Sequence, residues 1–173
     1  MSIRPILRMG HPVLARVADP VPDPRAPDIR ALVDDMGETM RAAGGRGIAA
    51  PQVGVPLRLV IFHAPLEDEE SRSLDGAPLT VLVNPVVEVV DPAMTTDWEG
   101  CLSLPGLKGA VPRPVAVRYR GLDLDGQPID RVARGFHARV VQHECDHLDG
   151  ILYPQRMADL STLAYLENEP FED

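Results

Sequence analysis

Apolar side chains recur at helical spacing in two stretches of the sequence. In the first stretch the intervals are three and four residues, at Ile29, Leu32, Val33, Met36, Met40 and Ala43. This period predicts a helix over residues 27–43, and Gly44 and Gly45 stand where a helix commonly ends. The second stretch predicts a helix over residues 136–149, and Gly150 takes the position of its C-terminal cap.

Shorter apolar runs predict β-strands. The predicted strands are residues 57–62, 79–90, 115–119 and 128–133. The second run is interrupted at Asn84-Pro85, so it forms either one strand or two. Asp125-Gly126 is typical of the hairpin turn that would join the last pair of strands.

The remaining stretches are polar or rich in proline. Residues 1–25 are expected to wrap the surface, and residues 64–78 and 91–98 are expected to be solvated connections. From about residue 161 to 173 a short apolar piece leads into an acidic tail. A chain of 173 residues without internal repeats predicts a single domain over residues 1–173.

The second predicted helix has two distinct faces at 100° per residue. Its apolar face consists of Val141, Cys145, Leu148 and Leu152, which predicts that Cys145 packs in the core. Val140, His143 and His147 gather on the other face, with Glu144 at its edge. His137 lies some 120° from His143 on the same helix and is not expected to reach it.

His143, Glu144 and His147 form the pattern His-Glu-x-x-His. Both imidazoles lie one helical turn apart and can bind one metal ion, while Glu144 can accept a proton from a metal-bound water. In a chain with 5 histidines this pattern arises by chance only about 0.01 times. The pattern therefore predicts a catalytic metal site.

The third ligand decides the class of metal site, because a catalytic metal usually keeps three protein ligands. Tyr153 stands where metzincins have a third histidine, which excludes that arrangement. A thermolysin-like site would need a downstream glutamate, and only Glu167, Glu169 and Glu172 remain. Cys101 offers a soft thiolate and is the better candidate chemically, although a lone cysteine is more often a buried structural residue.

Composition and charge narrow the function further. The net charge is −9, which disfavours direct nucleic-acid binding because phosphate contacts need Lys and Arg. No apolar run reaches the ~18 residues of a membrane span. Cys101 and Cys145 are interpreted as reduced thiols. A cytoplasmic protein without membrane contact is therefore expected, with an organelle as the less favoured location.

Three motifs together resemble the peptide deformylase family, in the order and spacing of that family. They are Gly45-Arg46-Gly47-Ile48-Ala49-Ala50-Pro51-Gln52, Glu99-Gly100-Cys101-Leu102-Ser103 and Gln142-His143-Glu144-Cys145-Asp146-His147. The similarity extends from about Ile6 to about Met157. Taken alone, the first motif is compatible with either a flexible turn or a loop whose backbone approaches another group closely.

The resemblance implies an α+β fold with antiparallel sheets packed around a central His-Glu-x-x-His helix. It implies a hydrolase that removes the N-formyl group from the formyl-methionine of newly made polypeptides and releases formate. The implied ligands of one divalent ion are Cys101, His143 and His147. That ion is ferrous iron in the family, with zinc, nickel or cobalt as substitutes.

The resemblance also implies roles in catalysis and binding. Glu144 becomes the catalytic base, and the Gln52 amide and the Leu102 backbone N–H become donors to the oxyanion. The peptide is expected to pair as an added strand along the first motif, at Gly45, Arg46, Gly47 and Ile48.

A methionine pocket is expected beside the metal. Val140 is the first candidate for its wall, and Phe136 is the second. Lys108 stands where many family members have Arg, and it lacks the planar guanidinium that a substrate contact there would use.

The expected partners are N-formyl-methionyl nascent peptides. Some bacterial members dock on the ribosome through a basic C-terminal helix, whereas residues 167–173 are acidic, so ribosome association is expected to be weak. Two other functions stay open on the sequence alone. One is a different metallohydrolase, such as a peptidase or amidase. The other is not an enzyme: a metal-stabilised binding module, or a family member that has lost activity.

Overall fold

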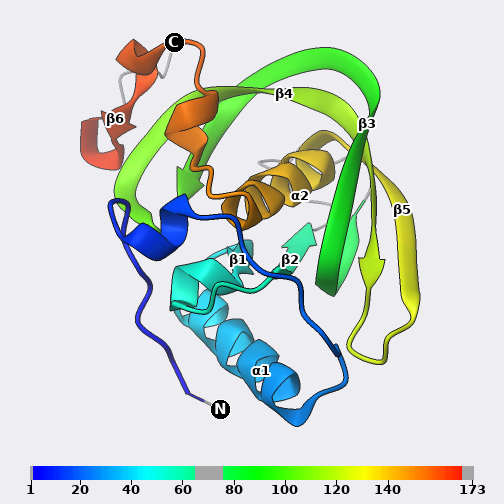
Figure 1. The fold of residues 1–173 in the computed structure, drawn as a ribbon. Helices are drawn as coiled ribbons and strands as arrows, with labels where there is room; N and C mark the ends of the chain where they lie inside the picture. The colour runs from blue at the N-terminus through cyan, green and yellow to red at the C-terminus, as the bar shows by residue number, and fades with distance from the viewer. Residues whose placement is uncertain (1, 65–75, 169–173) are drawn as a thin grey trace.

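A computed structural model describes residues 2–64 and 76–168 of the chain (Figure 1). Within these residues, two α-helices accompany one antiparallel sheet of six strands. The helices are α1 (Pro27–Ala42) and α2 (Gly135–Leu148), both within one residue of the predicted bounds. None of the described helices is long and apolar enough to cross a membrane.

The sheet follows chain order from β1 to β5, and β6 pairs with β4. The strands are β1 (Gly47–Ala49), β2 (Leu59–Ala64), β3 (Ala77–Cys101), β4 (Leu104–Leu122), β5 (Pro128–Arg134) and β6 (Ala164–Tyr165). The α+β class and the single domain were therefore predicted correctly. The strands form one connected sheet rather than the several that were expected.

The prediction that residues 91–98 form a connection is wrong. They continue β3 and pair with β4, for example Thr95 with Arg113 and Trp98 with Ala110. The side chains of residues 91–98 are exposed. The alternation of apolar and polar residues that marks a half-buried strand is therefore missing. Asn84, with φ +51°, marks the predicted interruption, but the strand continues past it through a register shift.

Residues 45–52 also differ from a simple loop. Gly47–Ala49 form β1, which pairs with β2, and residues 50–53 form a 3-10 turn. The predicted hairpin turn is present, because Gly126 adopts φ +75° between β4 and β5. The acidic residues 64–78 lie largely outside the described part of the chain, as do residues 169–173 of the acidic tail.

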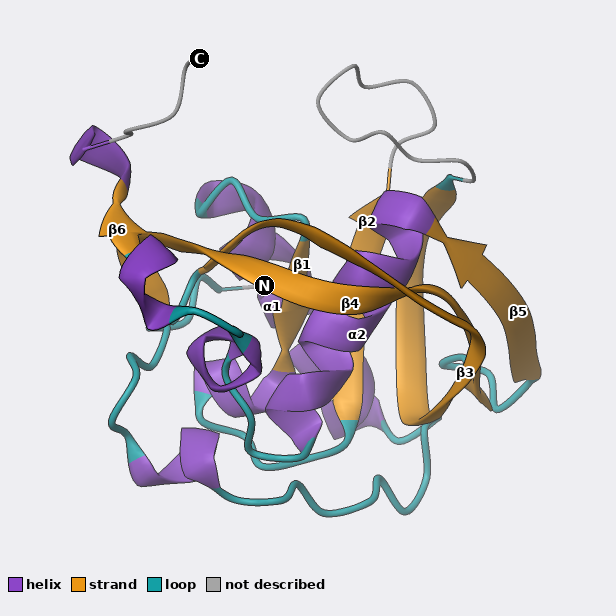
Figure 2. Cartoon of the chain, turned by 90° about the horizontal axis from the view of Figure 1, so that it is seen from above, coloured by secondary structure: helices purple, strands orange, loops and turns teal. Residues whose placement is uncertain are grey.

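Strands β3 and β4 pair to form a long two-stranded ribbon, the β3–β4 ribbon. This ribbon curves over α2, whereas β1 and β2 lie on the other side of α2 (Figures 1 and 2). Val141, Cys145 and Leu148 are buried between α2 and the sheet. This places Cys145 in the core, as predicted. A second core joins α1 to β1, β2 and β3. The other face of α2 carries His143 and His147.

The N-terminal segment runs along the surface, as predicted. The backbone N–H of Leu7 donates to the carbonyl of Gln52, and that of Met9 donates to the carbonyl of Ser103, at 2.8 and 2.9 Å. These two bonds tie the segment to the turns that carry two of the three motifs.

Candidate active site

Three potential metal ligands converge where the end of β3 meets α2. Cys101 ends β3, and His143 and His147 lie one turn apart on α2. Their ligand atoms lie within 4.8 Å of one another, and no other such group of three occurs among residues 2–64 and 76–168. The Sγ of Cys101 lies 3.4 Å from Nε2 of His147, and the Nδ1 of His143 bonds to Glu99 at 2.8 Å, which leaves Nε2 of His143 for the centre.

The electrostatics of these three groups suit a cation. Burial is the main cause that holds the pKa of His147 well below its usual range, and the charge of the neighbouring His143 is a smaller one. This imidazole is therefore neutral. Burial also lowers the pKa of His143, but hydrogen bonds to Cys101 and Glu99 outweigh it and hold that pKa well above normal. A positive charge is therefore favoured between Cys101 and the imidazoles. One thiolate and two imidazoles form a donor set that fits a divalent transition metal.

Glu144 lies beside this group and is almost fully buried. Burial raises the pKa of its carboxyl to about 7. Its Oε2 has no hydrogen-bond partner among the described residues, which is uncommon for a buried carboxylate. Glu144 therefore has one oxygen available to a water molecule or a substrate atom in the cavity.

The Gly47 backbone packs directly on the Glu144 carboxylate. A Cβ built at Gly47 would lie 2.6 Å from the carboxyl carbon of Glu144, so a larger residue would displace that side chain. Of the two interpretations of the first motif, the structure thus favours the close approach over the flexible turn.

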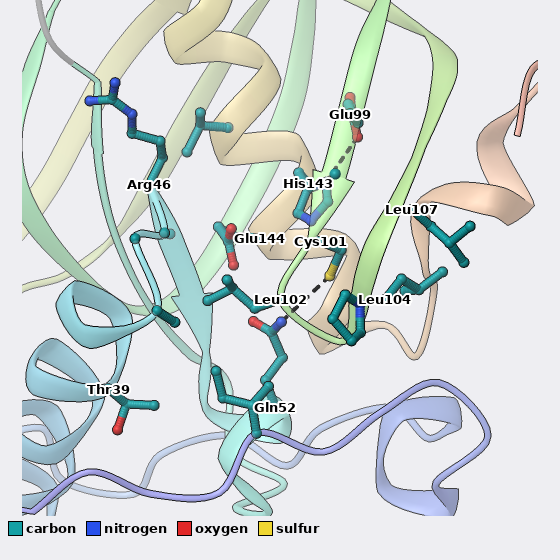
Figure 3. Close-up of a pocket in the computed structure, with 18 of the residues that line it drawn as sticks. Thr39, Arg46, Gln52, Glu99, Cys101, Leu102, Leu104, Leu107, His143 and Glu144 are labelled. Carbon is teal, nitrogen blue, oxygen red and sulfur yellow. Dashed lines mark hydrogen bonds and ion pairs between the residues drawn. The ribbon is translucent and has the colours of Figure 1, made fainter. Parts of the chain in front are cut away.

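Gln52 is held in a fixed orientation at the same opening. Its Oε1 accepts from the backbone N–H of Ala49 at 2.8 Å, and its Nε2 donates to Ser103 Oγ at 3.1 Å. The same Nε2 lies 3.5 Å from the Sγ of Cys101. Figure 3 shows Gln52, Leu102 and Glu144 around the space next to Cys101.

Behind the three ligands lies a buried ion network that sequence reasoning missed. Glu99 accepts from Nε of Arg113 at 2.6 Å and from Nη1 of Arg139 at 2.7 Å, besides its bond to His143. Arg113 also donates to Asp146 at 2.8 Å. Burial alone would raise the pKa of Glu99, but hydrogen bonds from Arg113 and His143 hold it well below its usual range.

One signal for this network was present in the sequence. Arg139, His143 and Asp146 are spaced by four and three residues, so they share a face of α2. Glu99 was noted only as part of a motif. Its contact with His143 fixes the orientation of that imidazole, a contact typical of metal-bound histidines.

A cavity of about 860 Å³ opens onto Cys101, His143 and Glu144, whereas His147 is not among the described residues that line it. Of the residues predicted to bind substrate, Gly45, Arg46, Gly47 and Val140 line it, and so does Phe136. Ile48 and Lys108 are not among the described residues that line the cavity.

The two residues that do not line the cavity have other contacts. Ile48 has its side chain fully buried in the core beneath α1. The ammonium of Lys108 lies 5.0 Å from the ring centroid of Trp98, and Trp98 itself lines the cavity. His137, predicted not to reach the histidine pair, is buried against Tyr119.

The thermolysin-like alternative finds no support in the described residues. Glu167 is exposed and does not belong to the group of ligands at Cys101. Glu169 and Glu172 lie outside the described part of the chain.

One cysteine sulfur and two imidazoles lie beside a buried carboxylate that faces the cavity, and this combination defines the site of a metal-dependent hydrolase. Residues 3–162 match the sequence model of the polypeptide deformylase family. The chain belongs to this family, whose members remove the formyl group from the N-terminus of newly made polypeptides. This hydrolysis, with release of formate, is the activity of the chain.

Individual relatives agree with this assignment. The chain is 54% identical to peptide deformylase 2 of Ralstonia nicotianae and to peptide deformylase 1 of Bordetella pertussis, over 95% of its own length and 93% of theirs. A crystal structure of peptide deformylase from Acinetobacter baumannii bound to Met-Ala-Ser superposes with a TM-score of 0.83 at 36% identity, covering 91% of this chain and 100% of that one.

A second solved structure, peptide deformylase from Ehrlichia chaffeensis in complex with actinonin, has a TM-score of 0.84 at 34% identity. It covers 94% of this chain and 92% of its own. These relatives set aside the unrelated peptidase and the inactive metal module that the sequence alone left open.

Proposed function

We propose that Cys101 of β3 and His143 and His147 of α2 together hold one divalent ion. This ion is ferrous iron in the cell, and zinc, nickel or cobalt can replace it. The convergence of one sulfur and two imidazole nitrogens beside the buried Glu144 carboxylate carries this proposal. A soft thiolate next to two imidazoles suits these metals better than magnesium or calcium, which prefer oxygen ligands.

A bound ion supplies a Lewis acid that lowers the pKa of water towards ~7. Glu144 accepts the proton of the attacking water and then passes it to the departing amine nitrogen. The Oε2 without a partner among the described residues supports this role, because it has no competing hydrogen bond to give up. Formate and a free amino terminus are the products.

Gln52 and Leu102 stabilise the negative charge that develops on the formyl oxygen. The Nε2 of Gln52 faces Cys101, and its amide cannot rotate without losing the bonds to Ala49 and Ser103. A donor held in place before the reaction stabilises charge without reorganisation, which is the property of an oxyanion hole. The backbone N–H of Leu102 is the second donor.

The methionine side chain occupies the part of the cavity between Val140 and Phe136. The peptide beyond it adds to β1 as a further strand, along Gly45, Arg46, Gly47 and Ile48. Because β1 stands at the end of the order of described strands, its outer edge suits this pairing. Ile48 contributes only its backbone, since its side chain is buried in the core.

Lys108 acts indirectly on the substrate. Its ammonium over the Trp98 ring holds that indole against the cavity. The peptide residues after methionine therefore meet Trp98 rather than Lys108 itself.

The substrates are N-formyl-methionyl nascent peptides, and the protein works in the cytoplasm without direct binding to nucleic acid or membrane. The net charge of −9 is repelled by ribosomal RNA. Weak, salt-sensitive association with purified ribosomes is therefore expected in a sedimentation assay. Tight binding that persists at high salt would contradict this part of the proposal.

Formate release tests the whole assignment. The protein is prepared anaerobically with ferrous iron and given formyl-Met-Ala-Ser, with acetyl-Met-Ala-Ser as the control. Fast release of formate without release of acetate is expected, because the formyl carbon is the least hindered of acyl carbons. If protein that carries one metal per chain releases neither formate nor acetate, the proposal is overturned.

A further inference from the structure

The segment after residue 162 lies along the mouth of the catalytic cavity. It falls outside the part of the chain that matches the family sequence model, which is residues 3–162. The described residues of this segment include β6 and a short turn, Leu166–Asn168. Figure 2 shows β6 at one end of β4, away from the β5 end of the sheet.

Three kinds of contact, the first made by Thr162 directly before the segment, anchor it to the sheet. Thr162 Oγ1 accepts from the backbone N–H of Ala110 at 3.3 Å. Leu163 packs on the small core of Leu104, Val111, Leu152 and Tyr153. β6 then pairs with β4, Ala164 opposite Lys108 and Tyr165 opposite Leu107. The position of Leu166 is therefore fixed by the sheet.

Leu166 lines the catalytic cavity, together with Leu104, Pro105, Gly106 and Leu107 of β4. Leu166 is half exposed, at 50%. In Figure 3, Leu104 and Leu107 lie on one side of the opening, and Arg46 and Thr39 lie on the other. One wall of the outer cavity is thus apolar, and Leu166 extends it beyond the sheet.

The cavity has room for more than the reacting residue. Its volume of about 860 Å³ lies near the upper end of the ~300–1,000 Å³ that is usual for sites of drug-sized ligands. A formyl-methionine fills only the inner part, next to Cys101 and Glu144. The peptide residues that follow must pass the apolar wall.

We propose that Leu166 is a specificity-determining residue for the substrate side chain after the initiator methionine, at the second or third position. Leu166 and Leu107 form an apolar surface that favours a large aliphatic side chain there over alanine. This inference rests on the proposed function, since the substrate must bind with its formyl group at Cys101 and Glu144.

The ratio of kcat/KM between peptides tests this role. The peptides are formyl-Met-Ala-Ser, formyl-Met-Leu-Ser and formyl-Met-Ala-Leu, and the protein is the full chain loaded with one metal. We expect one leucine peptide to exceed the alanine peptide by about 10-fold, and Leu166→Ala to lower that ratio by about 3–10-fold, mainly through KM. Leu166→Met should keep the ratio, because the volume and polarity are conserved.

Leu160→Ala is the matched control. Leu160 is also an exposed leucine in the same C-terminal region, at 64% exposure, but it does not line the cavity. It should leave all three rates unchanged. An equal loss on all peptides in Leu166→Ala would indicate a structural role and overturn the inference, as would a parent protein without any preference.

A positive charge at position 166 should increase the rate on acidic peptides, and a purely structural role of Leu166 could not produce that increase. Leu166→Lys should raise the rate on formyl-Met-Glu-Ser or formyl-Met-Ala-Glu, relative to the corresponding leucine peptide, by about 10-fold. An unchanged ratio would overturn the inference. The rate at which the parent protein deformylates formyl-Met-Ala-Ser tests the proposed function. The ratios between peptides test the role of Leu166, so failure of one can be told from failure of the other.

Discussion

At the scale of single residues, the proposed function gives the proton transfer to Glu144. Glu144→Ala removes the base but leaves all three proposed metal ligands, so the protein should retain its metal and lose about 10²–10⁴-fold in kcat. Metal content by atomic absorption and formate release, measured on the same preparation, check both halves. Near-normal turnover in the metal-loaded variant would exclude Glu144 as the base.

The close contact of Gly47 with Glu144 makes a second prediction at this scale. A methyl group at this position would collide with the Glu144 carboxylate, and a displacement of about 1 Å at a reacting group can cost 10²-fold. Gly47→Ala should therefore lose at least about 10²-fold in kcat while the fold is kept.

Gly37→Ala is a suitable control for that substitution. Gly37 lies inside α1, and its Cβ would meet nothing closer than 3.9 Å. This variant should keep full activity and gain about 0.5–1 kcal/mol in stability, because alanine favours the helix. Equal rates for Gly47→Ala and the parent would mean that Glu144 can move without consequence.

At the scale of elements, Arg113 of β4 joins β3 to α2 behind the proposed metal ligands. It bonds to Glu99 and Asp146 in the buried interior. Removal of one partner from a buried ion network typically costs about 3–5 kcal/mol, because the remaining charges stay desolvated. Arg113→Leu should lower the free energy of unfolding by about that amount in a urea titration.

Arg118→Leu provides the comparison on the same strand. Arg118 pairs with Asp130 at the surface, where both side chains are more than 40% exposed. Such a pair contributes at most about 1 kcal/mol. Similar losses in the two variants would show that burial of the Arg113 network adds nothing to stability.

The elements also show what the sequence could predict. Both helices were found within a residue because α1 buries one face, while α2, which has no exposed residue, keeps its apolar side chains and its histidines on separate faces. Either arrangement leaves a period of 3.6 in the sequence. The far half of β3 was missed because its side chains from 91 to 98 are exposed on both faces. Such a strand is defined by its pairing with β4, and pairing leaves no local pattern.

At the scale of the whole molecule, the site combines local and long-range information. His143, Glu144 and His147 were predictable because one helical turn brings them together. Cys101 was the better candidate chemically, but only the resemblance implied its role as a ligand, since 42 residues separate it from His143 along the chain. The contact of Glu99 with His143 depends on how the β3–β4 ribbon folds over α2, which no local pattern encodes.

The same architecture predicts how the molecule responds to loss of its metal. The two large cores contain none of the three proposed ligands, and the Glu99 and Arg113 network links α2 to the sheet through protein groups alone. The metal-free protein should therefore remain folded. An ion that binds only the folded state still stabilises it, by about 4 kcal/mol at 1,000 times its Kd.

For a domain of this size, a change of about 4 kcal/mol corresponds to about 8–16 °C in Tm. Anaerobic chelation should lower Tm within that range, and far-UV circular dichroism at 25 °C should keep its shape. Cys101→Ala, which removes one ligand, should show a smaller difference in Tm with and without metal. Loss of the dichroism signal on chelation would instead mean that the ion is needed for folding, because the protein groups behind it would not suffice to hold α2 in place.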